Sequence, residues 1–150
     1  IQKVGFSFNE VSEIKAVLDN GFIPDLIQVP YNYFDNRFEK FMIELKNKGC
    51  EIHTRSTFLQ GLFFADTELL PPFFKEVIPR IVKLQNEYKE LPGALLKYSL
   101  EKPFIDKVII GINNFSQLNE NIKFLNTENI LPKKNFKIPE NILIPSKWEK

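Results

Sequence analysis

Short apolar runs alternate along the chain with amphipathic segments, and this alternation restricts the fold more than any other feature. The runs at 4–7, 26–29, 50–56 and 107–112 have the length and composition of strands. Apolar residues at helical spacing predict helices at 9–20, 37–48, 73–88, 93–101 and 116–126. Strands that alternate with helices build right-handed βαβ units around a parallel sheet. The sequence therefore predicts an α/β fold with four βα units.

Turn and cap residues set the expected boundaries. Asn9 is placed to cap the first helix, and Gly21 and Gly49 supply the permissive position after the first two helices. Pro79 predicts a kink or a late start in the helix at 73–88. The irregular stretch at 57–72 separates the third strand from that helix.

The last strand and helix carry two further expectations. The run at 108–110 is consecutively β-branched, which suits a parallel strand covered on both faces. The final helix is expected to turn Leu118, Ile122 and Leu125 inward, and residues 127–150, with three prolines, read as a tail.

Composition excludes several classes of function. The 150 residues carry 20 basic and 19 acidic side chains, so no global charge attracts nucleic acid or an anionic membrane. Cys50 and His53 are each the only residue of their kind, which leaves no disulfide and no His- or Cys-rich metal site. No apolar run approaches the ~20 residues of a membrane span. We expect a cytoplasmic protein with no metal.

Periodicity alone leaves the architecture open. Four βα units make either a complete small sheet or half of an eight-unit barrel. The chain opens at Ile1, without Met, on the stretch at 1–7, which contains the first expected strand, and we expect it to be a fragment of a longer protein.

Specific stretches favour the barrel. In chain order they are Gly5-Phe6-Ser7 before a helix, Ile27-Gln28-Val29 with Tyr31-Asn32, His53-Thr54-Arg55-Ser56 with Gln60-Gly61-Leu62, Ile109-Ile110-Gly111 with Gln117-Leu118 and Glu120-Asn121, and the closing Ile144-Pro145-Ser146-Lys147-Trp148. Together they resemble the C-terminal half of an aldo-keto reductase, in its bacterial branch. The resemblance implies strands five to eight of a (β/α)8 TIM barrel over residues 1–126, followed by a C-terminal tail at 127–150.

The resemblance also implies a function. Members of this family are oxidoreductases that reduce an aldehyde or ketone with NAD or NADP, and their catalytic Asp, Tyr, Lys and His come from the first four strands. None of the catalytic positions falls in this chain, so we expect it to be inactive alone and to need the N-terminal barrel half or a homodimer partner. Two alternatives stay open: a self-associating half-barrel, and a non-catalytic module that senses nicotinamide nucleotides.

The residues implied to bind the cofactor fall at the ends of the expected strands. Ser7 and Gln28 match those that hydrogen-bond the nicotinamide carboxamide, although Phe8 replaces a frequent Asn. Arg55 stands where many members stack an aromatic ring on the nicotinamide. Ser56, Gln60 and Gly61 match the pyrophosphate loop, and the segment for the adenosine end contains Gly111, Asn113, Asn114, Gln117 and Asn121. Gly111, Ile112 and Gln117 replace the basic residues of NADP-specific members, which favours NAD or weak discrimination.

Structural roles compete with several of these interpretations. Ser7 could simply precede a helix, and Gln28 could be a buried amide with protein partners. Arg55 could form an ion pair with Glu51 or Asp66. His53 is expected to be a core histidine with satisfied hydrogen bonds, or one that supports the site without touching a ligand, and Cys50 is expected to be a buried apolar residue. The aromatic residues after the third strand could line an apolar substrate wall or pack against the other half of a barrel; they are Phe58, Phe63 and Phe64.

Overall fold

The fold was obtained as a computed structural model, which describes residues 1–123, 125 and 130–148. The chain divides into two compact units, Ile1–Thr57 with Ser99–Ile110 and Phe58–Tyr98 with Gly111–Lys150. Each unit is described by itself below.

The first unit is built on a parallel four-stranded sheet, as predicted. Its strands run in the order β1-β2-β3-β4, with bounds Gly5–Ser7, Leu26–Pro30, Glu51–Arg55 and Lys107–Val108. Every neighbouring pair is parallel. The order follows the chain, as it does in each half of a (β/α)8 barrel.

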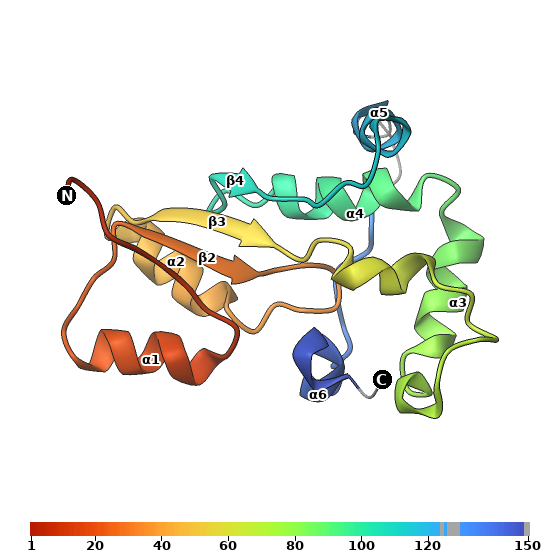
Figure 1. Ribbon diagram of the computed structural model, residues 1–150, viewed down its shortest axis with the longest axis horizontal. Coiled ribbons are helices and arrows are strands. Elements are labelled where there is room, and N and C mark those ends of the chain that lie inside the picture. Colours follow the sequence, from red (N-terminus) through yellow and green to blue (C-terminus); the bar gives the residue numbers. More distant parts are fainter. Residues whose placement is uncertain (124, 126–129, 149–150) are drawn as a thin grey trace. The chain divides into compact units, whose positions relative to one another are not determined.

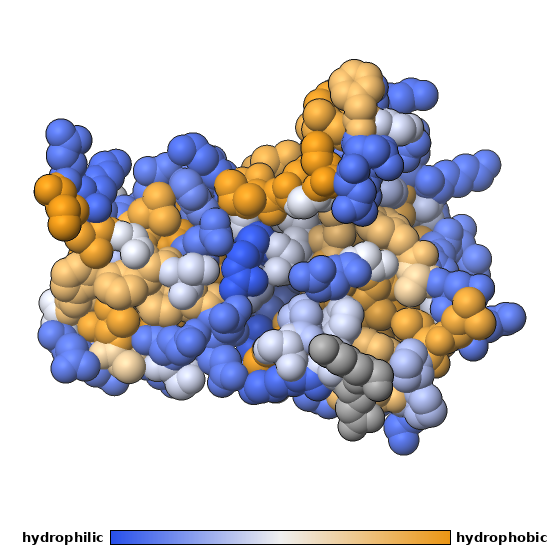
Figure 2. Space-filling model, viewed as in Figure 1, coloured by the Kyte–Doolittle hydropathy of each residue, from blue (hydrophilic) through white to orange (hydrophobic). Residues whose placement is uncertain are grey.

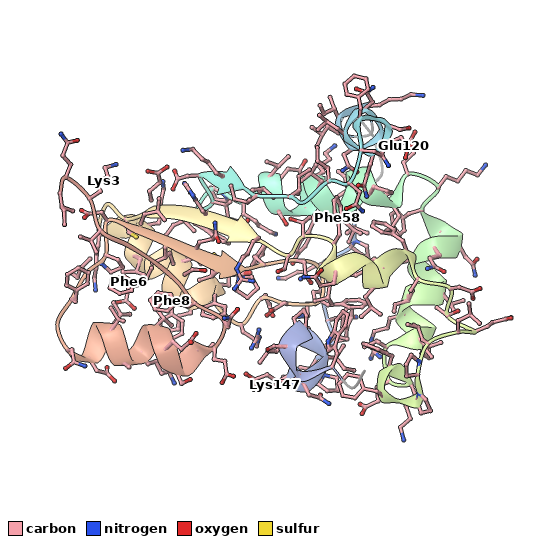
Figure 3. The ribbon with its side chains drawn as sticks, viewed as in Figure 1. Lys3, Phe6, Phe8, Phe58, Glu120 and Lys147 are labelled. Atoms are coloured by element: carbon pink, nitrogen blue, oxygen red, sulfur yellow. The ribbon has the colours of Figure 1, made fainter. Side chains whose placement is uncertain are left out.

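Two helices cover one face of this sheet. Helix α1 spans Val11–Asp19 and α2 spans Glu39–Asn47, and both return alongside the strands (Figure 1). Ile27 and Ile52, aligned on β2 and β3, are fully buried on the covered face. Phe6 and Phe8 project from β1 towards α1 (Figure 3), with their rings stacked at a centroid distance of 5.7 Å.

The helix ends follow the predicted glycines. Gly21 and Gly49 adopt φ of 77° and 87°, the left-handed conformation that closes α1 and α2. The predicted cap at Asn9 is wrong, because Glu10 occupies the N-cap position. The Glu13 carboxylate accepts bonds from the backbone N–H groups of Asn9 and Glu10 at 2.6 and 2.9 Å. A reach-back from the first turn thus replaces the Asn cap.

Strand β4 is much shorter than the predicted strand at 107–112. Its pairing with β3 ends at the Thr54–Val108 pair, followed by one bond from the Ile109 N–H to the Thr54 carbonyl at 2.7 Å. The cause lies in β3, since Ser56 turns into a left-handed conformation and ends the strand that β4 would follow. Ile109 is 43% exposed, so the expected cover on both faces is also wrong.

The second unit is mainly helical. Its elements are η1 at Leu59–Phe64, η2 at Pro72–Phe74, α3 at Ile78–Glu87, α4 at Leu91–Leu100 (whose last residues belong to the first unit), α5 at Phe115–Lys123, α6 at Glu140–Leu143 and η4 at Pro145–Lys147. Helix α3 starts late, with Pro79 in its first turn, which confirms the predicted late start rather than the predicted kink. The Gln85 side chain ties α3 to η1 by donating to the Phe63 and Ala65 carbonyls at 3.1 and 3.0 Å.

The predicted tail contains packed structure. Ile142, Leu143 and Ile144 are buried, and the Trp148 ring meets Phe74 edge-on at 5.0 Å. The predicted boundary between residues 126 and 127 lies outside the described residues, as does the predicted end of the last helix.

Helix α5 differs from its predicted orientation. Ile122 is 55% exposed rather than inward, whereas Asn121 is buried. No helix in the described ranges has the length and apolar character that a bilayer crossing requires.

Candidate functional site

One row of side chains crosses the sheet on the face opposite α1 and α2. Ser7, Gln28, His53 and Lys107 are aligned on β1 to β4, each the register partner of the next. Because aligned residues of parallel strands share a face, all four side chains emerge on the same side. Ser7 is exposed and Gln28 is half-buried. The structure thus brings together the two residues predicted to bind a carboxamide.

The β3–β4 end of this row is charged. Glu51 lies two residues before His53 on β3, and its Oε1 is 2.8 Å from His53 Nε2 and 3.0 Å from Lys107 Nζ. The bond to His53 and then that to Lys107 lower the pKa of the Glu51 carboxyl to about 2. His53 therefore has a structural partner, in line with its expected role.

Arg55 lies at the carboxyl end of β3, and its contacts differ from the ion pair considered with Glu51. Its guanidinium donates to the Phe8 carbonyl at 3.1 Å, to the Asn9 side chain at 2.5 Å and to Ser56 Oγ at 3.3 Å. Burial lowers the pKa of Arg55, while the carboxylates of Asp35 and Glu13 oppose that shift. These bonds fix a cation between the ends of β1 and β3.

The turn after β2 is a polar cluster that the sequence reasoning did not assign to the site. Asp35 is fully buried and holds Arg37 in a fork, with Oδ1–Nε at 2.9 Å and Oδ2–Nη2 at 2.8 Å. The Asn32 side chain is also fully buried and donates to the Ser56 carbonyl at 2.9 Å. Asn and Asp three residues apart after a strand are a turn signal that could have found this cluster.

The segment after β3 is conformationally strained. Ser56, in the first unit, has φ of 63°, a conformation that costs a non-glycine residue about 1–2 kcal/mol. In the second unit, Leu59, Gln60 and Gly61 are consecutively left-handed, with φ of 45°, 54° and 83°. Strain of this kind concentrates at ligand-binding loops. It falls on Ser56 and Gln60, two of the three residues predicted to meet a pyrophosphate, whereas the third, Gly61, adopts its positive φ without strain.

The predicted adenosine-binding residues lie just before α5 and along it. Asn114 Oδ1 accepts from the Gln117 N–H at 2.9 Å, and Gln117 Oε1 accepts from the Asn113 N–H at 2.8 Å. This reciprocal pattern is a helix cap, which gives Asn114 and Gln117 a structural role of their own. Asn121 differs, because its buried Nδ2 has no hydrogen-bond partner among the described residues. Gly111 is exposed, before the helix.

The aromatic residues after β3 separate into two kinds. Phe63 is fully buried and belongs to the core of the second unit, whereas Phe64 is 42% exposed. The rings of Phe58 and Phe64 are tilted towards each other at a centroid distance of 5.5 Å, with Phe58 half-buried. Of these three aromatic residues, Phe58 and Phe64 therefore have exposed surface that a substrate could contact.

Cys50 is a buried thiol. It is 2% exposed, and burial raises its pKa to about 11. A neutral thiol at physiological pH is a poor nucleophile, in line with its expected structural role. Within the described part of the chain, no three His, Cys, Asp or Glu side chains are grouped to hold a metal ion.

Comparisons with known proteins place the chain. The family model "Aldo/keto reductase family" matches residues 1–143. The holo form of aldo-keto reductase AKR11C1 from Bacillus halodurans matches in structure with a TM-score of 0.60 and 18% identity over 94% of this chain and 49% of that chain. The apo form gives the same TM-score and identity, over 94% and 50%. The chain thus spans about half the length of these structures, and no curated protein matches it.

Proposed function

The chain belongs to the aldo/keto reductase family, and from this membership we propose that it is the cofactor-binding half of an NAD(P)-dependent oxidoreductase that reduces an aldehyde or ketone. The observation that carries the proposal is the alignment of Ser7, the last residue of β1, with Gln28, in the middle of β2, on the sheet face opposite α1 and α2. Barrel enzymes of this architecture place their active sites at the carboxyl ends of the strands.

The described residues are compatible with a nicotinamide dinucleotide. A hydroxyl and an amide side by side supply both the donor and the acceptor that a carboxamide needs, which suits Ser7 and Gln28. The Asn121 amide, for which the described residues provide no acceptor, is a donor suited to a ring nitrogen of the adenine. Ser56, Gln60 and Gly61 would approach the pyrophosphate through left-handed backbone. The bound nicotinamide supplies the hydride, and these residues would hold and orient it.

Arg55 would act on the charge of the bound ring. Its guanidinium is held by Phe8, Asn9 and Ser56 at the end of β3. A fixed cation there disfavours the positively charged oxidised nicotinamide and favours the neutral reduced form. The absence of Lys and Arg from positions 111, 112 and 117 favours NAD over NADP.

We further propose that activity requires a second half-barrel. Both edges of the described sheet carry exposed apolar side chains, with Val4, Phe22 and Ile23 near β1 and Ile109 after β4. Apolar surface gathers over β1 and α1 in Figure 2. Edges of this kind invite pairing with further strands. The complement would be the N-terminal four βα units, which carry the catalytic groups of the family.

The experiment compares two proteins in a fluorescence titration with NADH and NADPH. The first is this 150-residue chain, and the second adds four preceding βα units. We expect the eight-unit protein to bind nicotinamide nucleotide and to reduce an aldehyde, and this chain alone to show no reduction. An eight-unit protein that neither binds the nucleotide nor turns over would refute the proposal.

The exposed edges also favour a second candidate, a half-barrel that pairs with its own copy. Two copies related by a two-fold axis would close an eight-stranded ring without another partner. Sedimentation at micromolar concentration separates the candidates. A dimer supports self-association, and a stable monomer removes it. A dimer that binds nucleotide without turnover would point to a nicotinamide sensor.

A further inference from the structure

Asn32 uses both ends of its amide, although its side chain has no access to solvent. Its Oδ1 accepts from the backbone N–H groups of Phe34 and Asp35 at 2.9 and 3.0 Å. Its Nδ2 donates to the carbonyl oxygen of Ser56, which is 24 residues away in the chain, at 2.9 Å. One side chain therefore shapes its own turn and bonds to the loop after β3.

The bond to Ser56 acts where the backbone is strained. Ser56 has φ of 63°, and its carbonyl faces the Asn32 amide. The preceding carbonyl, that of Arg55, accepts from the Tyr31 N–H at 3.0 Å. Two successive carbonyls are thus held from the turn after β2. Because a peptide group is planar and trans, fixing the Ser56 carbonyl also fixes the direction of the Thr57 N–H.

The turn that carries Asn32 is itself anchored. Asn32 and Asp35 exchange backbone hydrogen bonds at 3.0 and 3.1 Å. The Asp35 carboxylate is buried against the Arg37 guanidinium. Because this turn is anchored, the Asn32 amide can hold Ser56 in a left-handed conformation that Ser56 would otherwise leave.

We propose that Asn32 is a positioning residue for the nucleotide phosphates, which keeps Ser56 left-handed so that the loop after β3 is formed before the nucleotide arrives. This inference rests on the proposed function, because Ser56 must meet the phosphates for its conformation to matter. Asn32 itself need not touch the nucleotide.

The diagnostic variant is Asn32→Asp in the eight-unit protein. A carboxylate keeps the two acceptor bonds to Phe34 and Asp35 but cannot donate to the Ser56 carbonyl. We expect the affinity for NADH to fall roughly tenfold, while kcat at saturating NADH stays within about twofold. Ile14→Val, in the core on α1, is the control for a general loss of stability and should leave the affinity unchanged.

A double-mutant cycle that combines Asn32→Asp with Ser56→Gly tests whether Asn32 acts through the backbone conformation of Ser56. Glycine adopts a left-handed φ without a partner, so Asn32→Asp should cost much less affinity in the Ser56→Gly background. Amide hydrogen exchange without nucleotide gives a second readout, in which Asn32→Asp should speed exchange at Thr57 and Ile14→Val should not. If Asn32→Asp does not fold, Asn32→Ser keeps an acceptor for the turn and removes the bond to Ser56.

The outcomes distinguish the two proposals. If the wild-type protein binds no nicotinamide nucleotide, the proposed function fails. If the wild type binds and Asn32→Asp binds equally well, or if the two substitutions are additive in the cycle, the positioning role of Asn32 is overturned.

Discussion

The Asp35–Arg37 pair should dominate the stability of the turn after β2, and Arg37→Met is the substitution that tests it. The Asp35 side chain is fully buried and that of Arg37 is 14% exposed. Removing the guanidinium deprives the buried Asp35 carboxylate of its paired cation, and what remains are the Arg37 backbone N–H at 3.1 Å and the electrostatic attraction of Arg55. Breaking a buried pair in this way costs about 3–5 kcal/mol.

The slight exposure of Arg37 places the expected loss near the lower end of that range, at roughly 3 kcal/mol of unfolding free energy. Adding Asp35→Asn removes the stranded charge and retains an acceptor of the same shape. The double variant should therefore be more stable than Arg37→Met alone, by about 1–2 kcal/mol. Two independent core substitutions usually add their losses of unfolding free energy. A double variant that is more stable than Arg37→Met alone would therefore show that the unpaired Asp35 charge causes the loss.

Urea unfolding followed by far-ultraviolet circular dichroism provides the measurement, since Trp148 lies in the other unit and its fluorescence would report on that unit. Glu44→Gln is the control, because the Lys48–Glu44 pair is exposed at both ends, and it should change stability by less than about 0.5 kcal/mol. An Arg37→Met loss no larger than that of Glu44→Gln would refute the reasoning, as would a further loss on adding Asp35→Asn.

Three other outcomes are expected. The pKa of Cys50 is raised from 9.0 to about 11, so unfolding free energy should fall as pH rises between those values, and Cys50→Ala should remove the fall. The pKa of Glu51 is lowered from 4.5 to about 2, so the stability that the Glu51 carboxylate contributes should be present above pH 4.5 and be lost as pH falls towards 2. In Glu51→Gln, the melting temperature should depend less on pH over that interval. Gly61→Ala should cost about 1 kcal/mol in urea unfolding because φ is 83°, whereas Gly111→Ala, with no atom within 4 Å of its added Cβ, should be nearly neutral. Equal losses in the two glycine variants would contradict the role of backbone conformation.

Local signals predicted the sheet well but not where its last strand ends. Gly21 and Gly49 close helices because left-handed backbone is a local property. The β-branched run at 108–110 predicted a longer strand, since propensity takes no account of where a neighbour ends, and here β3 turns away at Ser56. The inward face expected for Ile122 failed for a related reason, because burial depends on what lies opposite.

The site was only partly predictable from the sequence. Ser7 and Gln28 were found through motifs at strand ends, and parallel register aligns them. Asn32 stood in one of those motifs, yet its bond to Ser56 spans 24 residues and depends on two loops meeting. Asp35 and Arg37 are close in sequence, but their burial, which gives the pair its energetic weight, is visible only in three dimensions.

The discontinuity of the first unit has a consequence for biosynthesis. Residues 1–57 leave the ribosome before β4, which follows only after the intervening segment 58–98. At bacterial or eukaryotic elongation rates, those roughly 40 residues take about 2–8 seconds. Throughout that interval the outer edge of β3 has no partner strand, and the nascent chain offers it to any other polypeptide emerging nearby.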